Sequence, residues 1–181
     1  MLLNAHTFFS HTYGTLSVKQ LVNESANLGY NCVCLTDINN TCAQIDFVDE
    51  CNKAGIKPLL GIDFRNMDES AHCLYIGIAK NALGLFELNS FLSQHLHAKK
   101  PFPKRAPYFE NVTLIYPFGN IPYSDLPKNA FIGIKPENIS RLIQVPENLL
   151  KKKSVALYPV SFKDKGDFYL HCLLRSVGLN T

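Results

Sequence analysis

The chain has 181 residues, which is the size of one domain or of two very small ones. With 46% hydrophobic and 18% charged residues it is too apolar to be intrinsically disordered. Its formal net charge of +3 is too small to predict a nucleic-acid-binding surface, although it does not exclude one.

Nothing in the sequence indicates a membrane or an export signal. No apolar stretch approaches the roughly 20 residues of a membrane span, and the N-terminus lacks the charged and apolar segments of a signal peptide. We therefore expect a cytoplasmic protein that makes no membrane contact. The six cysteines contain no C-x-x-C pair, so they are interpreted as buried, reduced thiols, and they lie at 32, 34, 42, 51, 73 and 172.

Short apolar runs alternate with helical patterns, which predicts an α/β fold with a mainly parallel sheet. Strands are expected at 2–6, 32–35, 58–64, 72–79, 112–116, 130–134 and 154–158. Helices are expected after two capping boxes, Ser17 with Gln20 and Thr41 with Gln44, and also over 81–93, 137–144 and 167–177. Gly29, Gly55 and Gly178 are expected to end three of the helices.

Periodicity alone does not decide between a closed barrel and an open sheet. A polar turn at 66–70 permits a hairpin between the third and fourth strands. Residues 95–109 are basic, rich in proline and without periodicity, so an exposed loop is expected there. Contact of its Lys99–Arg105 segment with nucleic-acid phosphates is an alternative. No second domain is visible in the sequence, so residues 1–181 are expected to form a single domain.

Four polar residues fall where parallel α/β folds carry their chemistry, at or near the ends of strands. These are His6, Asp37, Asp63 and His72, and such a set would suit a metal-dependent hydrolase. The alternatives are ordinary: Asp37 can be a turn-forming residue and His6 a hydrogen-bonded core histidine. No P-loop, no dinucleotide-binding glycine motif and no G-x-S-x-G nucleophile elbow occurs.

Five segments of the sequence form a recognisable set: NAHTFFS (4–10), LTDINN (35–40), AGIKPLLGIDF (54–64), HCLYIGIAKN (72–81) and DFYLHCLLR (167–175). Together they resemble the PHP (polymerase and histidinol phosphatase) domain, in particular the N-terminal PHP domain of bacterial DNA polymerase III alpha subunits in its reduced, Bacteroidetes-like form. The match is weaker and shortened over about 97–153. The resemblance implies a distorted barrel of seven parallel-type strands with helices outside. It also implies a metal cluster at the barrel mouth that cleaves phosphoesters.

Most of the metal ligands that the resemblance implies are replaced in this sequence. Three positions keep a donor: His6, Asp63 in place of a glutamate, and His72. The six replaced positions carry Asn4, Tyr13, Ile38, Pro117, Pro159 and Ser161. A multinuclear site needs several donors for each ion, so loss of phosphoesterase activity and no required cofactor are expected. A residual site for a single zinc or manganese ion is the alternative, because three protein ligands can hold one zinc.

Two functions follow from this resemblance. In the first, the chain is a non-catalytic PHP module of a polymerase alpha subunit, a fragment of a longer enzyme. It would pack against the remainder of that subunit, meet DNA only indirectly, and offer a docking surface, for example to the proofreading exonuclease. In the second, it is a metal-dependent phosphoesterase or 3′–5′ exonuclease that uses His6, Asp63 and His72, with Asp37 orienting a ligand histidine.

Overall fold

A computed structural model describes residues 1–66 and 72–179 of the chain. Seven strands form one sheet in sequence order: β1 (Leu2–Ala5), β2 (Cys32–Leu35), β3 (Lys57–Arg65), β4 (Cys73–Ala79), β5 (Val112–Pro117), β6 (Ala130–Ile134) and β7 (Ser154–Ala156). The helices are α1 (Val18–Asn27), α2 (Gln44–Ala54), α3 (Ala82–Ala98), α4 (Glu147–Lys153) and α5 (Lys165–Leu179), with 3₁₀ segments η1 (Tyr123–Asp125) and η2 (Pro136–Gln144). Apart from Asn66, the predicted polar turn at 66–70 lies outside the described residues.

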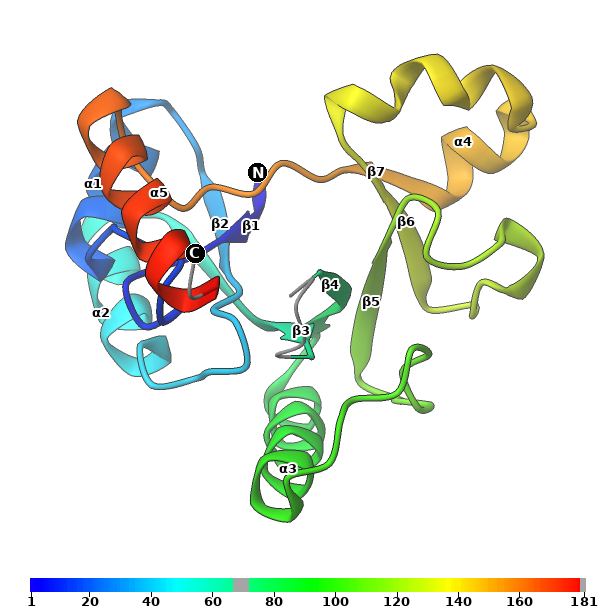
Figure 1. The fold of residues 1–181 in the computed structure, drawn as a ribbon, viewed down its shortest axis with the longest axis horizontal. Helices are drawn as coiled ribbons and strands as arrows, with labels where there is room; N and C mark the ends of the chain where they lie inside the picture. Colours follow the sequence, from blue (N-terminus) through cyan, green and yellow to red (C-terminus); the bar gives the residue numbers. More distant parts are fainter. Residues whose placement is uncertain (67–71, 180–181) are drawn as a thin grey trace.

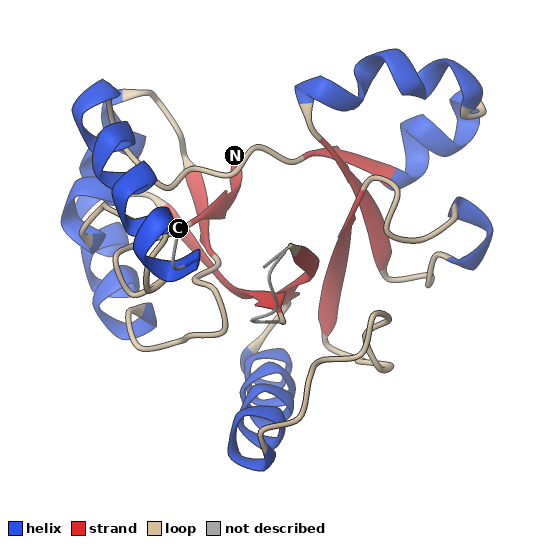
Figure 2. Cartoon of the chain, in the orientation of Figure 1, coloured by secondary structure: helices blue, strands red, loops and turns tan. Residues whose placement is uncertain are grey.

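The sheet curls into a ring, and the helices lie on its outside (Figures 1 and 2). The segment that follows β7 completes the ring beside β1, where His6 N donates to Val160 O over 2.8 Å and Val160 N donates to Asn4 O over 2.9 Å. The predicted α/β barrel is therefore confirmed over the open sheet. The expectation of seven parallel-type strands was wrong in one respect: β4 runs antiparallel to both β3 and β5. The connection from β3 to β4 is too short for the crossover that parallel neighbours require.

Local sequence signals explain one helix start and fail at another. Ser17 Oγ accepts from Gln20 N over 3.2 Å and Ser17 N donates to Gln20 Oε1 over 2.9 Å, so the first capping box is present, and Gly29 follows α1 at φ +75°. The box predicted from Thr41 and Gln44 was wrong. The Gln44 side chain instead donates to the Gly61 carbonyl of β3 over 3.2 Å, and α2 begins without a side-chain cap.

At the C-terminus, Gly178 does not end α5, which continues to Leu179. A Cβ at Gly178 would lie 2.6 Å from Thr12 Oγ1, so this glycine allows α5 to approach the loop after β1 closely.

The basic segment is more than an exposed loop. Helix α3 continues through its first four residues to Ala98, and Phe102 and Phe109 are buried in the apolar cluster that also holds Phe64. Burial of these two aromatic rings holds in place a stretch of chain that shows no periodicity.

The expectation that all six cysteines are buried was wrong in part, since Cys42 and Cys172 are exposed while Cys34 and Cys51 are buried. In the described part of the chain, no helix combines the length and apolar character needed to cross a membrane.

Candidate functional site at the barrel mouth

The centre of the site is Asp63, a fully buried carboxylate on β3 that is held by two cationic or protonatable partners. Arg65 Nε donates to Asp63 Oδ1 over 3.0 Å and Arg65 Nη2 donates to Oδ2 over 2.6 Å. His6 Nε2 lies 3.1 Å from the same Oδ2 atom. Residues two apart on a strand face the same side, which is why Arg65 reaches back to Asp63. Both carboxylate oxygens are therefore occupied from within the protein.

This arrangement fixes the charge of the pair. Burial by itself raises the pKa of the Asp63 carboxyl, but the Arg65 guanidinium and the His6 ring outweigh it and hold that pKa well below its usual range. Burial likewise works against the charged form of Arg65, and Asp63 more than offsets it, so the pKa of Arg65 is raised. The mouth of the barrel thus contains an ionised, internally neutralised pair.

Asp37, the second buried carboxylate of the region, is held by neutral donors. It accepts from Thr7 N, Thr7 Oγ1 and Ser10 Oγ, each over 2.7 Å. Gly14 closes the same loop, because a Cβ at that position would lie 1.9 Å from Thr7 O. Asp37 therefore organises the loop after β1. Neither the histidine-orienting role nor the simple local turn predicted for it matches these contacts.

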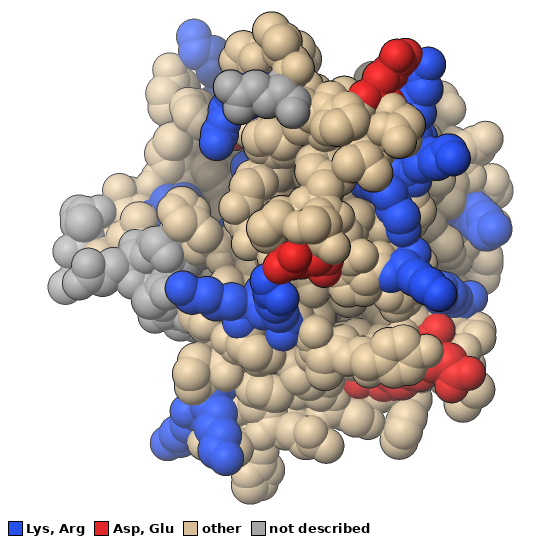
Figure 3. All heavy atoms as spheres, turned by 90° about the vertical axis from the view of Figure 1, so that its right-hand side faces the viewer, with Lys and Arg blue, Asp and Glu red and all other residues tan. Residues whose placement is uncertain are grey.

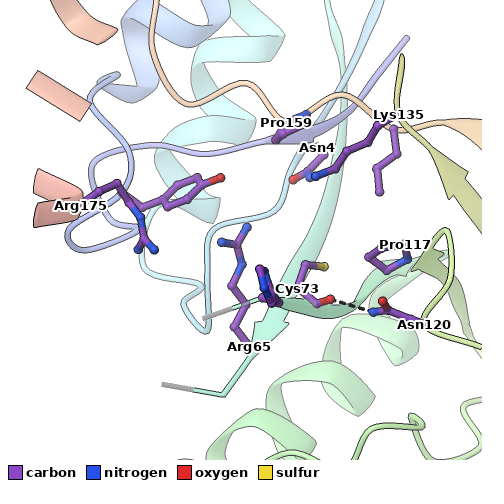
Figure 4. A pocket seen from close by; sticks show the side chains of 11 residues that line it. Asn4, Arg65, Cys73, Pro117, Asn120, Lys135, Pro159 and Arg175 are labelled. Carbon is purple, nitrogen blue, oxygen red and sulfur yellow. Dashed lines mark hydrogen bonds between the residues drawn. The ribbon is translucent and has the colours of Figure 1, made fainter. Parts of the chain in front are cut away.

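A pocket of about 330 Å³ opens beside the Asp63–Arg65 pair and is lined by residues from distant parts of the chain (Figure 4). Five of the residues singled out in the sequence line it: Asn4, Tyr13, His72, Pro117 and Pro159. The remaining lining residues are Arg65, Cys73, Asn120, Lys135, Leu157 and Arg175. Positions that the PHP resemblance marked as former metal ligands thus converge in space, although they are spread over more than 150 residues of sequence.

The pocket is not lined by four of the other predicted site residues, Ser161, Ile38, His6 and Asp63. Ser161 is buried and lines a neighbouring cavity with Tyr13 and Pro159. Ile38 takes part through its main chain, which forms a β-bridge with Asp63. His72 is exposed at the rim of the pocket, whereas His6 and Asp63 are fully buried.

The residues present do not fit the metal cluster that the fold family implies. Both oxygens of Asp63 are engaged by Arg65, whose fixed positive charge opposes a nearby cation. Burial, followed by the nearby Asp63 charge, raises the pKa of the Cys73 thiol well above its usual value, which disfavours the thiolate that a metal binds. Among the described residues, no group of three or more His, Cys, Asp or Glu side chains could hold an ion.

The sequence reasoning missed three cations of the pocket, Arg65, Lys135 and Arg175. For Arg65 a signal existed, because it follows Asp63 by two residues and a strand places both on one face. Lys135 directly follows the strand predicted at 130–134, at the kind of position already searched for acids and histidines. Nothing in the sequence brings Arg175, near the end of α5, to Tyr13, whose ring it reaches at 5.4 Å.

The curled sheet, the outer helices and the polar cluster at the mouth define this protein as an α/β barrel, a class of fold whose functional sites lie at the ends of the strands. The sequence matches the PHP domain family over residues 3–173, and the chain belongs to that family.

Similarity to individual proteins is partial. The chain is 30% identical over 98 residues to the DNA polymerase III subunit alpha of Ureaplasma parvum, covering 54% of this chain and 10% of that protein. It is 35% identical over 96 residues to the same subunit of Pseudomonas aeruginosa, covering 51% and 8%. The chain thus spans about a tenth of the length of these relatives.

Two solved structures are also similar. One, from Bifidobacterium adolescentis, is described as a metal-dependent phosphoesterase and has a TM-score of 0.41 at 22% identity, over 53% of this chain and 32% of that one. The other is an amidohydrolase from Chromobacterium violaceum with bound sulfate and no metal, with a TM-score of 0.43 at 18% identity, over 54% and 34%.

Proposed function

We propose that this chain is a non-catalytic PHP module of a DNA polymerase III alpha-type polypeptide, which acts in DNA replication as a scaffold and docking domain. The observation that carries the proposal is the Arg65–Asp63 pair. Among the described residues, the counter-ion of the buried Asp63 carboxylate at the barrel mouth is an arginine. A phosphoesterase of this family needs metal ions at that place. Family membership and the similarity to polymerase alpha subunits supply the setting.

A second feature supports docking. Helix α5 has no buried residue, and its apolar side chains are exposed along its length, among them Tyr169 (62% exposed), Leu173 (61%) and Val177 (67%). This helix packs against the loop after β1, where Gly178 approaches Thr12 and His171 Nδ1 lies 2.6 Å from Tyr13 O. A run of exposed apolar side chains on one helix is typical of a surface that another polypeptide covers. The partners proposed are the remainder of the polymerase polypeptide and the proofreading exonuclease subunit.

Metal dependence tests the non-catalytic part. The purified chain should keep its melting temperature when EDTA is added, and zinc or manganese should not raise it, because neither ion binds the folded state preferentially. It should hydrolyse neither a phosphate monoester nor a DNA 3′ end in either metal. Metal-dependent hydrolysis that disappears in His6→Ala would overturn the proposal.

The docking part needs its own experiment. Binding of the exonuclease subunit from the same organism is measured by calorimetry for the wild type, for Leu173→Asp on α5 and for Leu83→Asp on α3. Leu83 is 64% exposed and serves as a matched control. Loss of binding in Leu173→Asp alone supports α5 as the docking surface, and equal binding by all three proteins contradicts it.

The second candidate is a metal-dependent phosphoesterase that uses His6, Asp63 and His72. One observation favours it: His6 Nδ1 is buried without a hydrogen-bond partner among the described residues, and an unpaired imidazole nitrogen is a potential metal ligand. The activity assay above separates the two candidates.

Direct contact of the basic segment with DNA receives less support. Arg105 is already paired with Asp125. The face that carries α4 shows many Lys and Arg side chains with Asp and Glu among them (Figure 3), and Lys151 there pairs with Glu147 over 2.6 Å. Mixed charges of this kind are typical of a solvated surface. DNA contact therefore stays indirect in this proposal.

A further inference from the structure

A second hollow, an apolar groove of about 360 Å³, runs between β7 and the start of η2. Six of its nine lining residues have hydrocarbon side chains, among them Ile139, Val155 and Leu157. We infer that this groove binds an extended, acidic peptide segment of another polypeptide, which adds a strand to the free edge of β7. The inference goes beyond the docking role of α5, because it assigns a second surface and a partner of different chemistry.

The outer edge of β7 carries main-chain groups that have no partner strand. Among the described residues, β7 pairs with β6 alone, and Leu157 N donates to β6 over 2.9 Å. Successive residues of a parallel strand direct their main-chain groups to alternate edges, so those of Ala156 and Tyr158 point away from β6. Neither residue has a main-chain hydrogen bond on that side within the described part of the chain, and pairing with β1 begins at Val160. An open strand edge of this kind accepts a further strand.

The groove offers apolar surface next to that edge. Tyr158 is 64% exposed, and Ile139 of η2 is 63% exposed. Large apolar side chains that line a groove and remain exposed are typical of a binding surface. A peptide strand laid against β7 alternates its side chains between two faces, so every second residue faces the groove and its neighbours face solvent. The expected peptide therefore alternates apolar with polar residues.

The charge of this region selects an acidic peptide. Residues 128–158 contain six cations and two carboxylates, an excess of four positive charges, whereas the formal net charge of the whole chain is +3. Both carboxylates, Glu137 and Glu147, are paired with a lysine of the same segment. Four cations make no ion pair with any described residue: Lys128, Arg141, Lys152 and Lys153. The last two end α4 directly before β7, and Figure 3 shows Lys and Arg side chains spread over this side of the molecule.

A nucleic acid strand, which is also a polyanion, fits the groove less well. Its phosphates need cations along the whole path, and its bases stack on exposed aromatic rings. The described residues that line the groove include one cation, Lys135, and one aromatic ring, Tyr158. Hydrocarbon walls beside a free strand edge match the main chain and the apolar side chains of a peptide instead.

Selection from a library of random decapeptides on the immobilised 181-residue chain identifies the preferred sequences. Fluorescence anisotropy then measures the affinity of the most enriched peptide. Enriched peptides should carry a net negative charge and have apolar residues at every second position. Two forms of that peptide, methylated on alternate sets of main-chain nitrogens, test the strand pairing. One form should bind like the parent and the other should bind about tenfold or more weakly, because only one set of N–H groups faces β7.

Four variants locate the binding site. Ile139→Asp should weaken binding by about tenfold or more, and its matched control is Ile143→Asp, on the same 3₁₀ segment, 88% exposed and outside the groove lining. Lys152→Glu should weaken binding by about fivefold or more at low ionic strength. Its control is Lys100→Glu, which makes the same charge change at a lysine that is likewise exposed and without an ion pair in the described ranges. Both controls should bind like the wild type, and thermal melting followed by circular dichroism shows whether each variant is folded.

The inference is overturned if no peptide is enriched, if the enriched peptides are neutral or basic, if Ile139→Asp and Ile143→Asp bind alike, or if both methylated forms bind like the parent. It is also overturned if single-stranded DNA displaces the peptide and loses affinity in Lys152→Glu but not in Ile139→Asp, which would assign this face to nucleic acid. Loss of peptide binding in Leu173→Asp, with binding intact in Ile139→Asp, would place the peptide on α5. That result contradicts the groove and leaves the proposed docking role of α5 standing.

Discussion

Two buried carboxylates lie at neighbouring strands of this barrel, and they are stabilised in different ways. Asp37, after β2, accepts three hydrogen bonds from the hydroxyl and main-chain groups of one loop. Asp63, in β3, has a guanidinium and an imidazole as partners. The first arrangement shapes the loop after β1. The second keeps a full positive charge at the place where the fold family holds its metals, so the two residues have separate roles despite similar burial.

The largest effect is expected from removing the guanidinium. Arg65→Met leaves Asp63 as a buried charge whose side-chain partners among the described residues are His6 and the Cys73 thiol. It should lower the free energy of unfolding by about 3–5 kcal/mol, because neither of these partners carries the fixed positive charge of Arg65. Urea denaturation followed by circular dichroism measures this. The double variant Asp63→Leu/Arg65→Met should recover much of the loss, because it removes both charges. A loss below about 1 kcal/mol in the single variant would mean that Asp63 has another counter-ion.

A smaller effect is expected at the neutral site. Asp37→Asn keeps the shape of the side chain but replaces an acceptor oxygen with a donor that faces Thr7 Oγ1. We expect a loss of about 2 kcal/mol in the same urea experiment. A loss larger than that of Arg65→Met would reverse the proposed ranking of the two carboxylates.

Acid stability gives a third comparison. Because the pKa of Asp63 is lowered on folding, the unfolded chain binds more protons at acid pH. Its contribution to stability is present above the ordinary aspartate pKa of about 3.9 and is lost as pH falls below it, by up to about 1.4 kcal/mol per pH unit. Asp63→Asn should show a shallower loss than the wild type in urea titrations between about pH 4 and pH 2. Parallel curves would contradict the ion pair.

The smallest effect is expected from a single donor of the neutral site. Thr7→Val removes the hydroxyl that donates to Asp37 Oδ2 and keeps the side-chain shape. The main-chain N–H of Thr7 and the Ser10 hydroxyl remain as donors, so the loss should be about 1 kcal/mol. The midpoint of urea unfolding checks this. A loss equal to that of Asp37→Asn would mean that this one hydroxyl carries the whole interaction.

Much of the barrel could be predicted from the sequence, since buried strands and capped helices leave local signals. The capping box at Ser17 and the strand at Ala130–Ile134 depend on residues that are close in sequence, and both predictions are confirmed. The side chain of Gln44 was misread because its partner, the Gly61 carbonyl, lies on another strand. Phe102 and Phe109 were misjudged for the same reason, since their burial depends on a core assembled from distant segments.

The site was only partly predictable. The PHP resemblance identified Asn4, Tyr13, Pro117 and Pro159 as positions where a metal ligand is replaced, and the structure places these four residues in one pocket. The cations of the pocket were not among the predicted residues, although Arg65 is two residues from Asp63 and a strand places both on one face. The approach of Arg175 to Tyr13 depends on how α5 packs against the loop after β1, where His171 Nδ1 lies 2.6 Å from Tyr13 O. Sequence spacing contains no record of that packing.

Arg65 and a metal ion are competing counter-ions for Asp63, and we expect Arg65 alone to fill this role. Crystals of the protein grown with manganese or zinc and measured at the absorption edge of the metal distinguish the two. We expect no anomalous peak at the barrel mouth, with the guanidinium in contact with both carboxylate oxygens. A peak at about 2.0–2.2 Å from an Asp63 oxygen and a His6 nitrogen, with Arg65 displaced, would contradict it.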